Sequence, residues 1–136
     1  MTQRRLTFLI TGGAGFLGHN LARFLLSKGH QVRTIDLSDF DYPDIEGVQH
    51  FEADIRDREL LRKAASGVDV IVHAAAGLPL WKPKEIKSVN IDGVRAVLEV
   101  AYELGIERVV HVSSTAVYGI PDHHPLVETD NLYGVG

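Results

Sequence analysis

A glycine-rich turn near the start of the chain constrains its fold more than any other feature. Residues 6–10 form a short apolar run, and the sequence TGGAGFLG follows directly at residues 11–18. Apolar residues at helical spacing come next: Phe16, Leu17, Leu21, Phe24 and Leu25. A strand, a glycine turn and a helix in this order are typical of sites that bind the pyrophosphate of a dinucleotide.

The three glycines of this turn have different predicted roles. Gly12 permits a tight turn, Gly15 lets a pyrophosphate approach a backbone without a Cβ, and Gly18 lets the helix pack closely on the sheet. The helix N-terminus adds free N–H groups and the positive end of a dipole. A purely structural turn is the alternative for a glycine triplet alone. The surrounding strand and helix favour the phosphate site.

Composition limits the classes of protein that remain. A chain of 136 residues predicts one domain over residues 1–136, and 45% apolar with 24% charged residues is typical of globular proteins. A net charge of -4 does not suggest nucleic-acid binding. The absence of cysteine excludes disulfides and thiolate metal sites, and no apolar run has the length of a membrane span. We expect a cytoplasmic protein without a metal site.

Predicted strands and helices alternate along the rest of the chain. The strands are expected at residues 31–37, 48–53, 68–73 and 106–112, and the helices at residues 56–65 and 85–104. This alternation predicts a Rossmann-type α/β fold, a doubly wound parallel sheet with helices on both faces in three α/β/α layers. The expected strand order is 3-2-1-4-5, with a ligand site at the crevice between strands 1 and 4.

Acidic residues follow the second and third predicted strands. Asp36 lies about 20 residues beyond the glycine turn, where a carboxylate accepts hydrogen bonds from an adenosine ribose and repels a 2′-phosphate, which favours NAD over NADP. A cap or a solvated turn residue is the alternative. Asp54 is a candidate partner of the adenine amino group, with Ile55 beside the ring. The alternative for Asp54 is the N-cap of the next helix, and the two roles are compatible.

Small and hydroxyl residues follow the fourth and fifth predicted strands. Ala74, Ala75 and Ala76 leave space for a ligand at the end of a central strand, although close helix packing requires the same residue types. Hydroxyls at Ser114 and Thr115 come at the carboxyl end of the fifth strand, at the edge where open α/β sheets bind ligands.

Three further residues have two open interpretations each. His73 is expected to be a packed or capped strand residue rather than a base or ligand, because no second ligand lies beside it at metal spacing. Asn90 is either a bridge at the site or an exposed side chain. Trp81 lies in a proline-bearing segment that lines a pocket or forms a surface loop.

Five stretches together resemble the extended short-chain dehydrogenase/reductase family. They are residues 11–18, Asp36, residues 54–55, residues 74–77, and the sequence VSSTAVYG at residues 112–119. Within that family the chain is most similar to the NAD-dependent nucleotide-sugar epimerase/dehydratase branch, which includes the UDP-glucose 4-epimerases. The resemblance extends over essentially the whole chain.

The resemblance implies a set of cofactor-binding residues and a catalytic hydroxyl. The implied NAD-binding residues are Gly12, Gly15, Phe16, Leu17, Gly18, Asp36, Asp54, Ile55, Ala74, Ala75, Ala76 and Asn90. The implied catalytic residue is Ser114, with Thr115 as its neighbouring alternative. The resemblance also implies NAD as cofactor, a nucleotide sugar or another small hydroxylated substrate, and a homodimer.

The family also uses a Tyr-x-x-x-Lys pair, in which the Lys lowers the pKa of the Tyr so that it acts as general acid/base. Tyr133 comes early for this role, and we expect it to belong to the loop before the motif. We therefore expect the chain to be the N-terminal part of a longer enzyme, without its substrate domain. The alternatives are a related reductase of dihydroflavonol or hydroxysteroid type, or a non-catalytic NAD-binding sensor or scaffold.

Overall fold

A computed structural model describes residues 3–134 and contains a five-stranded sheet in the order β3-β2-β1-β4-β5. The strands are β1 (Thr7–Thr11), β2 (Gln31–Asp36), β3 (Val48–Glu52), β4 (Val70–His73) and β5 (Arg108–His111). All four neighbouring pairs are parallel. The predicted Rossmann-type topology and strand order are therefore confirmed, with small differences at the strand ends.

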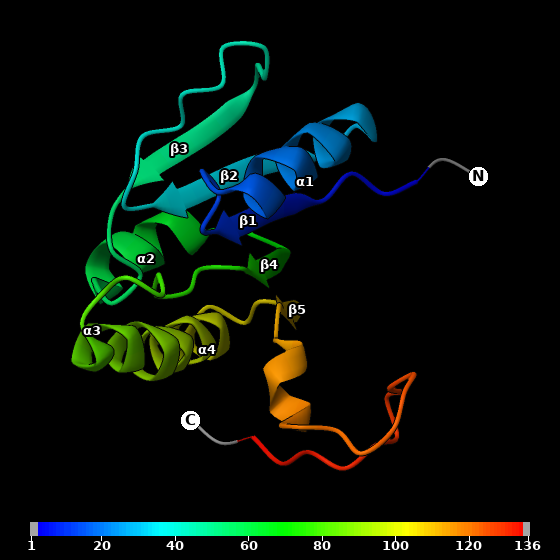
Figure 1. The fold of residues 1–136 in the computed structure, drawn as a ribbon. Helices are drawn as coiled ribbons and strands as arrows, with labels where there is room; N and C mark the ends of the chain where they lie inside the picture. Colours follow the sequence, from blue (N-terminus) through cyan, green and yellow to red (C-terminus); the bar gives the residue numbers. More distant parts are fainter. Residues whose placement is uncertain (1–2, 135–136) are drawn as a thin grey trace.

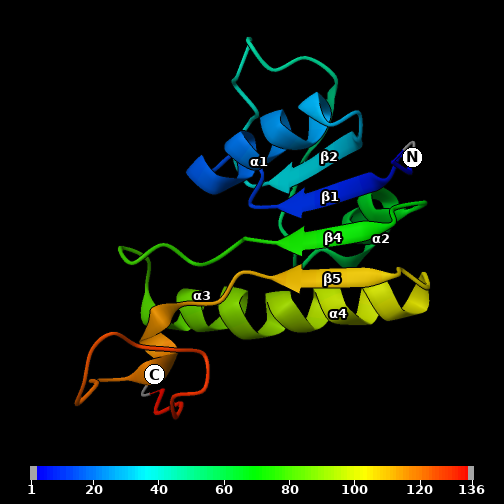
Figure 2. The same cartoon turned by 90° about the vertical axis from the view of Figure 1, so that its right-hand side faces the viewer.

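The helices lie on both faces of this sheet, as Figures 1 and 2 show. They are α1 (Phe16–Ser27), α2 (Arg58–Ala65), α3 (Pro83–Ser88), the π-helical turn η1 (Val89–Gly93), α4 (Val94–Glu103) and the 3-10 turn η2 (Thr115–Tyr118). Because α3, η1 and α4 follow one another without a break, they form the long helix predicted from the sequence. In the described part of the chain, no helix is long and apolar enough to cross a membrane.

Alternate strand residues supply two separate apolar clusters. Leu9 and Ile71 pack in the cluster beneath α2 and α4, whereas Ile10 and Val72 pack with Leu25 beneath α1. This period of two is expected of strands that are covered on both faces. Each fully buried aliphatic side chain contributes about 1.5–3 kcal/mol. The central strands are thus fixed from both sides.

The buried face of α1 consists mainly of small residues. The residues of α1 that are buried are Gly18, Ala22 and Leu25. Three large apolar side chains of this helix are 84%, 48% and 56% exposed: Phe16, Leu17 and Phe24. The reason is close packing, since a Cβ on Gly18 would lie 2.6 Å from the Cα of Gly13. Small residues bring the helix against the turn, and the large ones lie on its flanks.

The start of α2 also differs from the prediction. The helix begins at Arg58 and follows Asp57, whose carboxylate accepts hydrogen bonds from the backbone N–H groups of Glu59 and Leu60 at 3.1 and 3.2 Å. An N-cap of this kind satisfies donors that the first helical turn leaves free. Asp57 rather than Asp54 is therefore the N-cap, and the alternative role predicted for Asp54 is wrong.

Candidate cofactor site

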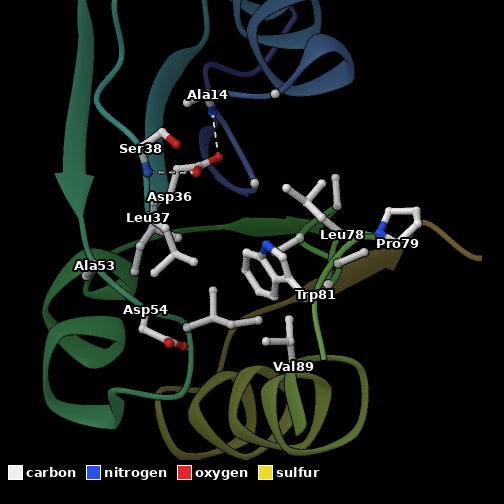
Figure 3. A pocket seen from close by; sticks show the side chains of 18 residues that line it. Ala14, Asp36, Leu37, Ser38, Ala53, Asp54, Leu78, Pro79, Trp81 and Val89 are labelled. Carbon is white, nitrogen blue, oxygen red and sulfur yellow. Dashed lines mark hydrogen bonds between the residues drawn. The ribbon is translucent and has the colours of Figure 1, made fainter. Parts of the chain in front are cut away.

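A cavity of about 560 Å³ lies at the carboxyl ends of β1, β2, β3 and β4, and Figure 3 shows it from close by. Its lining comes from the glycine turn, from residues 35–38, 53–55 and 74–79, and from Trp81 and Val89. The cavity includes the predicted crevice between the first and fourth strands and continues past it to β3. Its volume is within the usual range of small-molecule sites.

The glycine turn forms one wall of the cavity. Gly12 has a φ of +69°, and a Cβ on it would lie 2.9 Å from the backbone of Ala75. Its N–H donates to the carbonyl of Ile35 at 2.9 Å, so the turn is held against the ends of both β2 and β4. Gly15 is the N-cap of α1 and lines the cavity. The N-terminus of the 12-residue helix α1 therefore faces the cavity, where it favours the binding of an anion.

The carboxylate of Asp36 is fixed by two backbone groups at the end of β2. One oxygen accepts from the N–H of Ala14 and the other from the N–H of Ser38, both at 3.0 Å (Figure 3). An ionised carboxylate offers about four acceptor positions. Each oxygen of Asp36 thus keeps a free position, which suits two neighbouring hydroxyl groups.

Asp54 lines the cavity beside the buried Ile55, and in Figure 3 it lies across the cavity from Ala14. Its Oδ1 accepts from the backbone N–H of Arg56 at 2.8 Å and from Nε at 3.0 Å, and its Oδ2 accepts from Nη2 at 2.7 Å. The hydrogen bonds from Arg56 hold the pKa of Asp54 below its usual value. Sequence reasoning missed Arg56, although its position two residues after an acidic site residue was a usable signal.

The wall at the end of β4 is held by a buried hydroxyl. Thr11 Oγ1 accepts from the N–H groups of Ala74 and Ala75 at 3.2 Å and lies 2.7 Å from His73 Nδ1. Because backbone N–H groups only donate, the Thr11 hydroxyl donates to Nδ1, and the proton of the neutral ring lies on Nε2. Burial, and then the nearby His111, lower the pKa of His73 to about 4. His73 is a packed strand residue, as predicted.

The structure places the two side chains that the sequence left between a site role and a surface role. Asn90, on η1, is exposed and does not line the cavity, but its side chain accepts a hydrogen bond from the N–H of Gly77 in the cavity wall at 2.9 Å. The ring of Trp81 extends into the cavity in Figure 3, with Leu78 and Pro79 beside it. The proline-bearing segment is thus a lining element rather than a detached surface loop.

Some predicted site residues lie outside this lining. Phe16 and Leu17 are exposed at the start of α1, and Gly18 packs beneath the turn. Ser114 and Thr115 are exposed beyond β5, where Ser114 Oγ accepts from the N–H of Ala116 at 3.1 Å. Within residues 3–134, no three His, Asp or Glu side chains gather closely enough to hold a metal ion.

Comparison with known proteins places this fold and cavity in a family. Residues 8–135 match the NAD dependent epimerase/dehydratase family, and the chain belongs to it. This family membership agrees with the glycine turn, the acidic residue after β2 and the strand order, each of which is found where the resemblance required it.

Several curated relatives carry different activities in their names. The chain is 37% identical over 119 residues to sterol demethylase protein B of Methylococcus capsulatus, which covers 85% of this chain and 36% of the relative. It is 34% identical over 131 residues to the UDP-glucose 4-epimerase of Streptomyces lividans, covering 90% and 40%. It is 33% identical over 117 residues to a 3 beta-hydroxysteroid dehydrogenase/Delta 5-->4-isomerase of Mycobacterium tuberculosis, covering 80% and 32%. The chain thus spans 32–40% of the length of these relatives.

Solved structures share the fold closely. The UDP-glucose 4-epimerase of Bifidobacterium longum in complex with NAD+ and UDP matches with a TM-score of 0.86 and 28% identity, over 94% of this chain and 43% of that one. A short-chain dehydrogenase/reductase superfamily protein of Agrobacterium tumefaciens with bound NAD matches with a TM-score of 0.85 and 29% identity, over 96% and 40%.

Proposed function

We propose that this chain is the NAD(H)-binding domain of an NAD-dependent sugar-nucleotide epimerase or dehydratase. The observation that carries the proposal is the Asp36 carboxylate, held by Ala14 and Ser38 inside the cavity with one acceptor position free on each oxygen. Such a group suits the two hydroxyls of an adenosine ribose and opposes a 2′-phosphate by charge repulsion. Relatives with bound NAD support the same cofactor.

The residues present fit a dinucleotide along the length of the cavity. Gly12 lets the turn pack against Ala75, Gly15 leaves room for the pyrophosphate because it has no Cβ, and the N-terminus of α1 favours the negative charge of the pyrophosphate. Asp54 and Ile55 flank the adenine end, and Ala74, Ala75 and Ala76 form the wall along the cofactor. When bound, NAD supplies a hydride acceptor for the oxidation of a substrate carbinol.

Ser114 is the proposed catalytic hydroxyl of the whole enzyme, and Thr115 is the alternative. Both follow β5 at the same edge of the sheet as the cavity and are open to a substrate. A serine hydroxyl both donates and accepts hydrogen bonds, so it can orient the substrate carbinol during proton transfer. We further propose that the whole protein is a homodimer through α4, whose Leu98 and Tyr102 are 51% and 89% exposed.

A second candidate function is favoured by one comparison. The similarity to a hydroxysteroid dehydrogenase supports a reductase that uses the same cofactor site on a less polar substrate. Assays of the whole protein with UDP-glucose and with a 3 beta-hydroxysteroid, each followed by NADH absorbance and product analysis, separate the two.

Isothermal titration calorimetry on the chain tests the cofactor assignment. We expect NAD to bind with micromolar to sub-millimolar affinity and NADP to bind more weakly. Asp36→Ala should weaken NAD binding by about tenfold, since hydrogen bonds to a charged group contribute about 1.5–3 kcal/mol. The same substitution should reduce the difference in affinity between NAD and NADP. Absence of NAD binding by a folded sample would contradict the proposal.

A further inference from the structure

We propose that Tyr42 is a positioning residue for the ribose end of the cavity, where it fixes the backbone of Ala14 and thereby the Asp36 carboxylate. The inference rests on the proposed NAD-binding function. It assigns a role in cofactor binding to the loop at residues 37–47, which lies between β2 and β3.

The hydroxyl of Tyr42 contacts the glycine turn at the residue that holds Asp36. It donates a hydrogen bond to the carbonyl of Ala14 at 2.6 Å, and the N–H of Ala14 donates to Asp36 Oδ2 at 3.0 Å (Figure 3). Ala14 and Asp36 line the cavity, whereas Tyr42 does not. Tyr42 therefore acts on the site through Ala14 rather than through contact with a ligand.

The ring of Tyr42 is held in place by two neighbouring rings. His19 of α1 stacks against it, with ring centroids 4.1 Å apart and planes inclined by 16°, and Phe40 meets it edge to face at 4.9 Å. His19 is itself fixed, because its Nδ1 donates to the carbonyl of Gly15 at 2.8 Å. The hydroxyl therefore reaches Ala14 from a ring that has little freedom to turn.

The loop that carries Tyr42 is attached to the body of the protein. Ile45 is 8% exposed, and its N–H donates to the carbonyl of Tyr42 at 2.9 Å, which closes a turn. Asp44 in that turn forms an ion pair with Arg23 of α1 at 2.6 Å. Phe40 packs against the apolar cluster beneath α1. These contacts fix the loop to the same helix whose N-terminus faces the cavity.

The other backbone donor to Asp36 has a separate support. His50 Nε2 donates to the carbonyl of Ser38 at 3.0 Å, and His50 Nδ1 accepts from the hydroxyl of Thr34 at 2.8 Å. This assignment follows because a carbonyl only accepts, so the proton of the neutral ring lies on Nε2. Since Ser38 holds Asp36 Oδ1 without a contact to Tyr42, removal of the Tyr42 hydroxyl should loosen only Oδ2.

The Asp36 carboxylate binds two neighbouring hydroxyls best when it is already fixed, because less freedom is then lost on binding. Loss of the Tyr42 hydroxyl removes a partner from the Ala14 carbonyl, and the turn gains freedom at the residue whose N–H orients Oδ2. The affinity for a ligand that bonds to both oxygens should then fall. A site that lacks the Asp36 carboxylate should not show this loss.

Calorimetric titration with NAD of the wild type, Tyr42→Phe, Asp36→Ala and the double variant tests the inference. Phenylalanine keeps the ring contacts of Tyr42 and removes only the hydroxyl. Tyr42→Phe should weaken NAD binding by about fivefold in the wild-type background, as expected of one hydrogen bond. In the Asp36→Ala background it should weaken binding by about twofold or less, since the effects of coupled residues are not additive.

Ser27→Ala is the matched control. The hydroxyl of Ser27 also donates to a backbone carbonyl at 2.6 Å, that of Phe24, but it lies at the other end of α1 and does not line the cavity. This substitution should leave NAD affinity within about twofold of the wild type. Urea unfolding of each variant checks that the compared samples are folded.

The outcomes separate this inference from the function on which it rests. If Tyr42→Phe weakens NAD binding equally in both backgrounds, Tyr42 supports the turn in general and the inference is wrong. It is also wrong if Tyr42→Phe binds NAD as tightly as the wild type, or if Asp36→Ala does so. If the folded wild type does not bind NAD, the proposed function fails before any variant is compared.

Discussion

The ends of β4 and β5 lie side by side in the sheet but have different surroundings. His73 and His111 are partners in the parallel register, yet His73 is 1% exposed whereas His111 is exposed. The backbone beyond β4 is held by the Thr11 hydroxyl, whereas Ser114 beyond β5 is exposed. The wall proposed to bind the cofactor is therefore rigid and internally bonded, and the residues proposed for substrate chemistry lie in an open segment.

The position of β5 in the sheet explains this difference. It pairs with β4 on one edge, and among the described residues no further strand pairs with its other edge. In Figure 2, α4 runs along one face of β5. Val110 is 44% exposed and Val112 is 42% exposed. An edge strand with exposed apolar groups is a place where other protein segments associate.

The first prediction concerns how the stability of the fold depends on pH through the buried His73. The unfolded chain takes up a proton on His73 as the pH falls through 6.5, but the folded chain does so only near 4. Protonation of His73 therefore does not affect the free energy of unfolding above pH 6.5. As the pH falls from 6.5 toward 4, it lowers the free energy of unfolding by up to about 3 kcal/mol. Urea unfolding of the wild type and of His73→Asn at pH 7 and pH 4 should show the larger loss in the wild type. Equal losses in the two proteins would argue that His73 does not titrate as a buried group.

The second prediction separates close packing from backbone strain in the glycine turn. Gly12 and Gly29 both have positive φ, +69° and +84°, but only at Gly12 would a Cβ meet backbone atoms, those of Ala75 and Ala74. Left-handed backbone alone costs an alanine about 1–2 kcal/mol. Overlap with fixed atoms adds about 1–3 kcal/mol. By urea unfolding, Gly12→Ala should therefore be less stable than Gly29→Ala by about 2 kcal/mol, and similar values would mean that the β4 wall moves aside.

The third prediction concerns the fluorescence of Trp81 when NAD binds in the cavity. Trp81 is the one tryptophan of the sequence and it lines the cavity. NAD binding should therefore change the tryptophan emission, and the titration curve should give the calorimetric affinity. Trp81→Phe should remove the signal and reduce the affinity by about 1 kcal/mol or less, because an aromatic ring remains. An emission unchanged at saturating NAD would place the cofactor away from this wall.

The smallest effect is expected at the open end of β5. Ser114 does not line the cavity, so Ser114→Ala should leave NAD affinity within about twofold of the wild type, as for separate sites. The same calorimetric titration measures it. A loss comparable to that of Asp36→Ala would mean that the two strand ends form one site.

The fold was predictable because its signals are local. The glycine turn, the carboxylate of Asp36 and the alternation of short apolar runs specify the topology without any knowledge of distant contacts. The cavity follows from that topology, since open parallel sheets bind ligands at the carboxyl ends of their strands. Gly12, Asp36 and Ala75 accordingly lie where the sequence predicts them.

What the sequence did not predict depends on packing and on distant partners. Hydrophobicity at helical spacing predicts α1 but does not show which of its residues are buried: Phe16 and Phe24 are exposed, whereas the small Gly18 and Ala22 are buried against the rest of the protein. Arg56 joins Asp54 to Glu85, which is 29 residues further along the chain, and no local pattern indicates that contact.

A crystal structure of the chain with NAD tests the central claim most directly. We predict a dinucleotide along the cavity, with the adenosine ribose hydroxyls hydrogen-bonded to both oxygens of Asp36 and the pyrophosphate against Gly12 and Gly15. NAD bound at another surface, or an Asp36 carboxylate without a ligand hydroxyl beside it, would contradict the account.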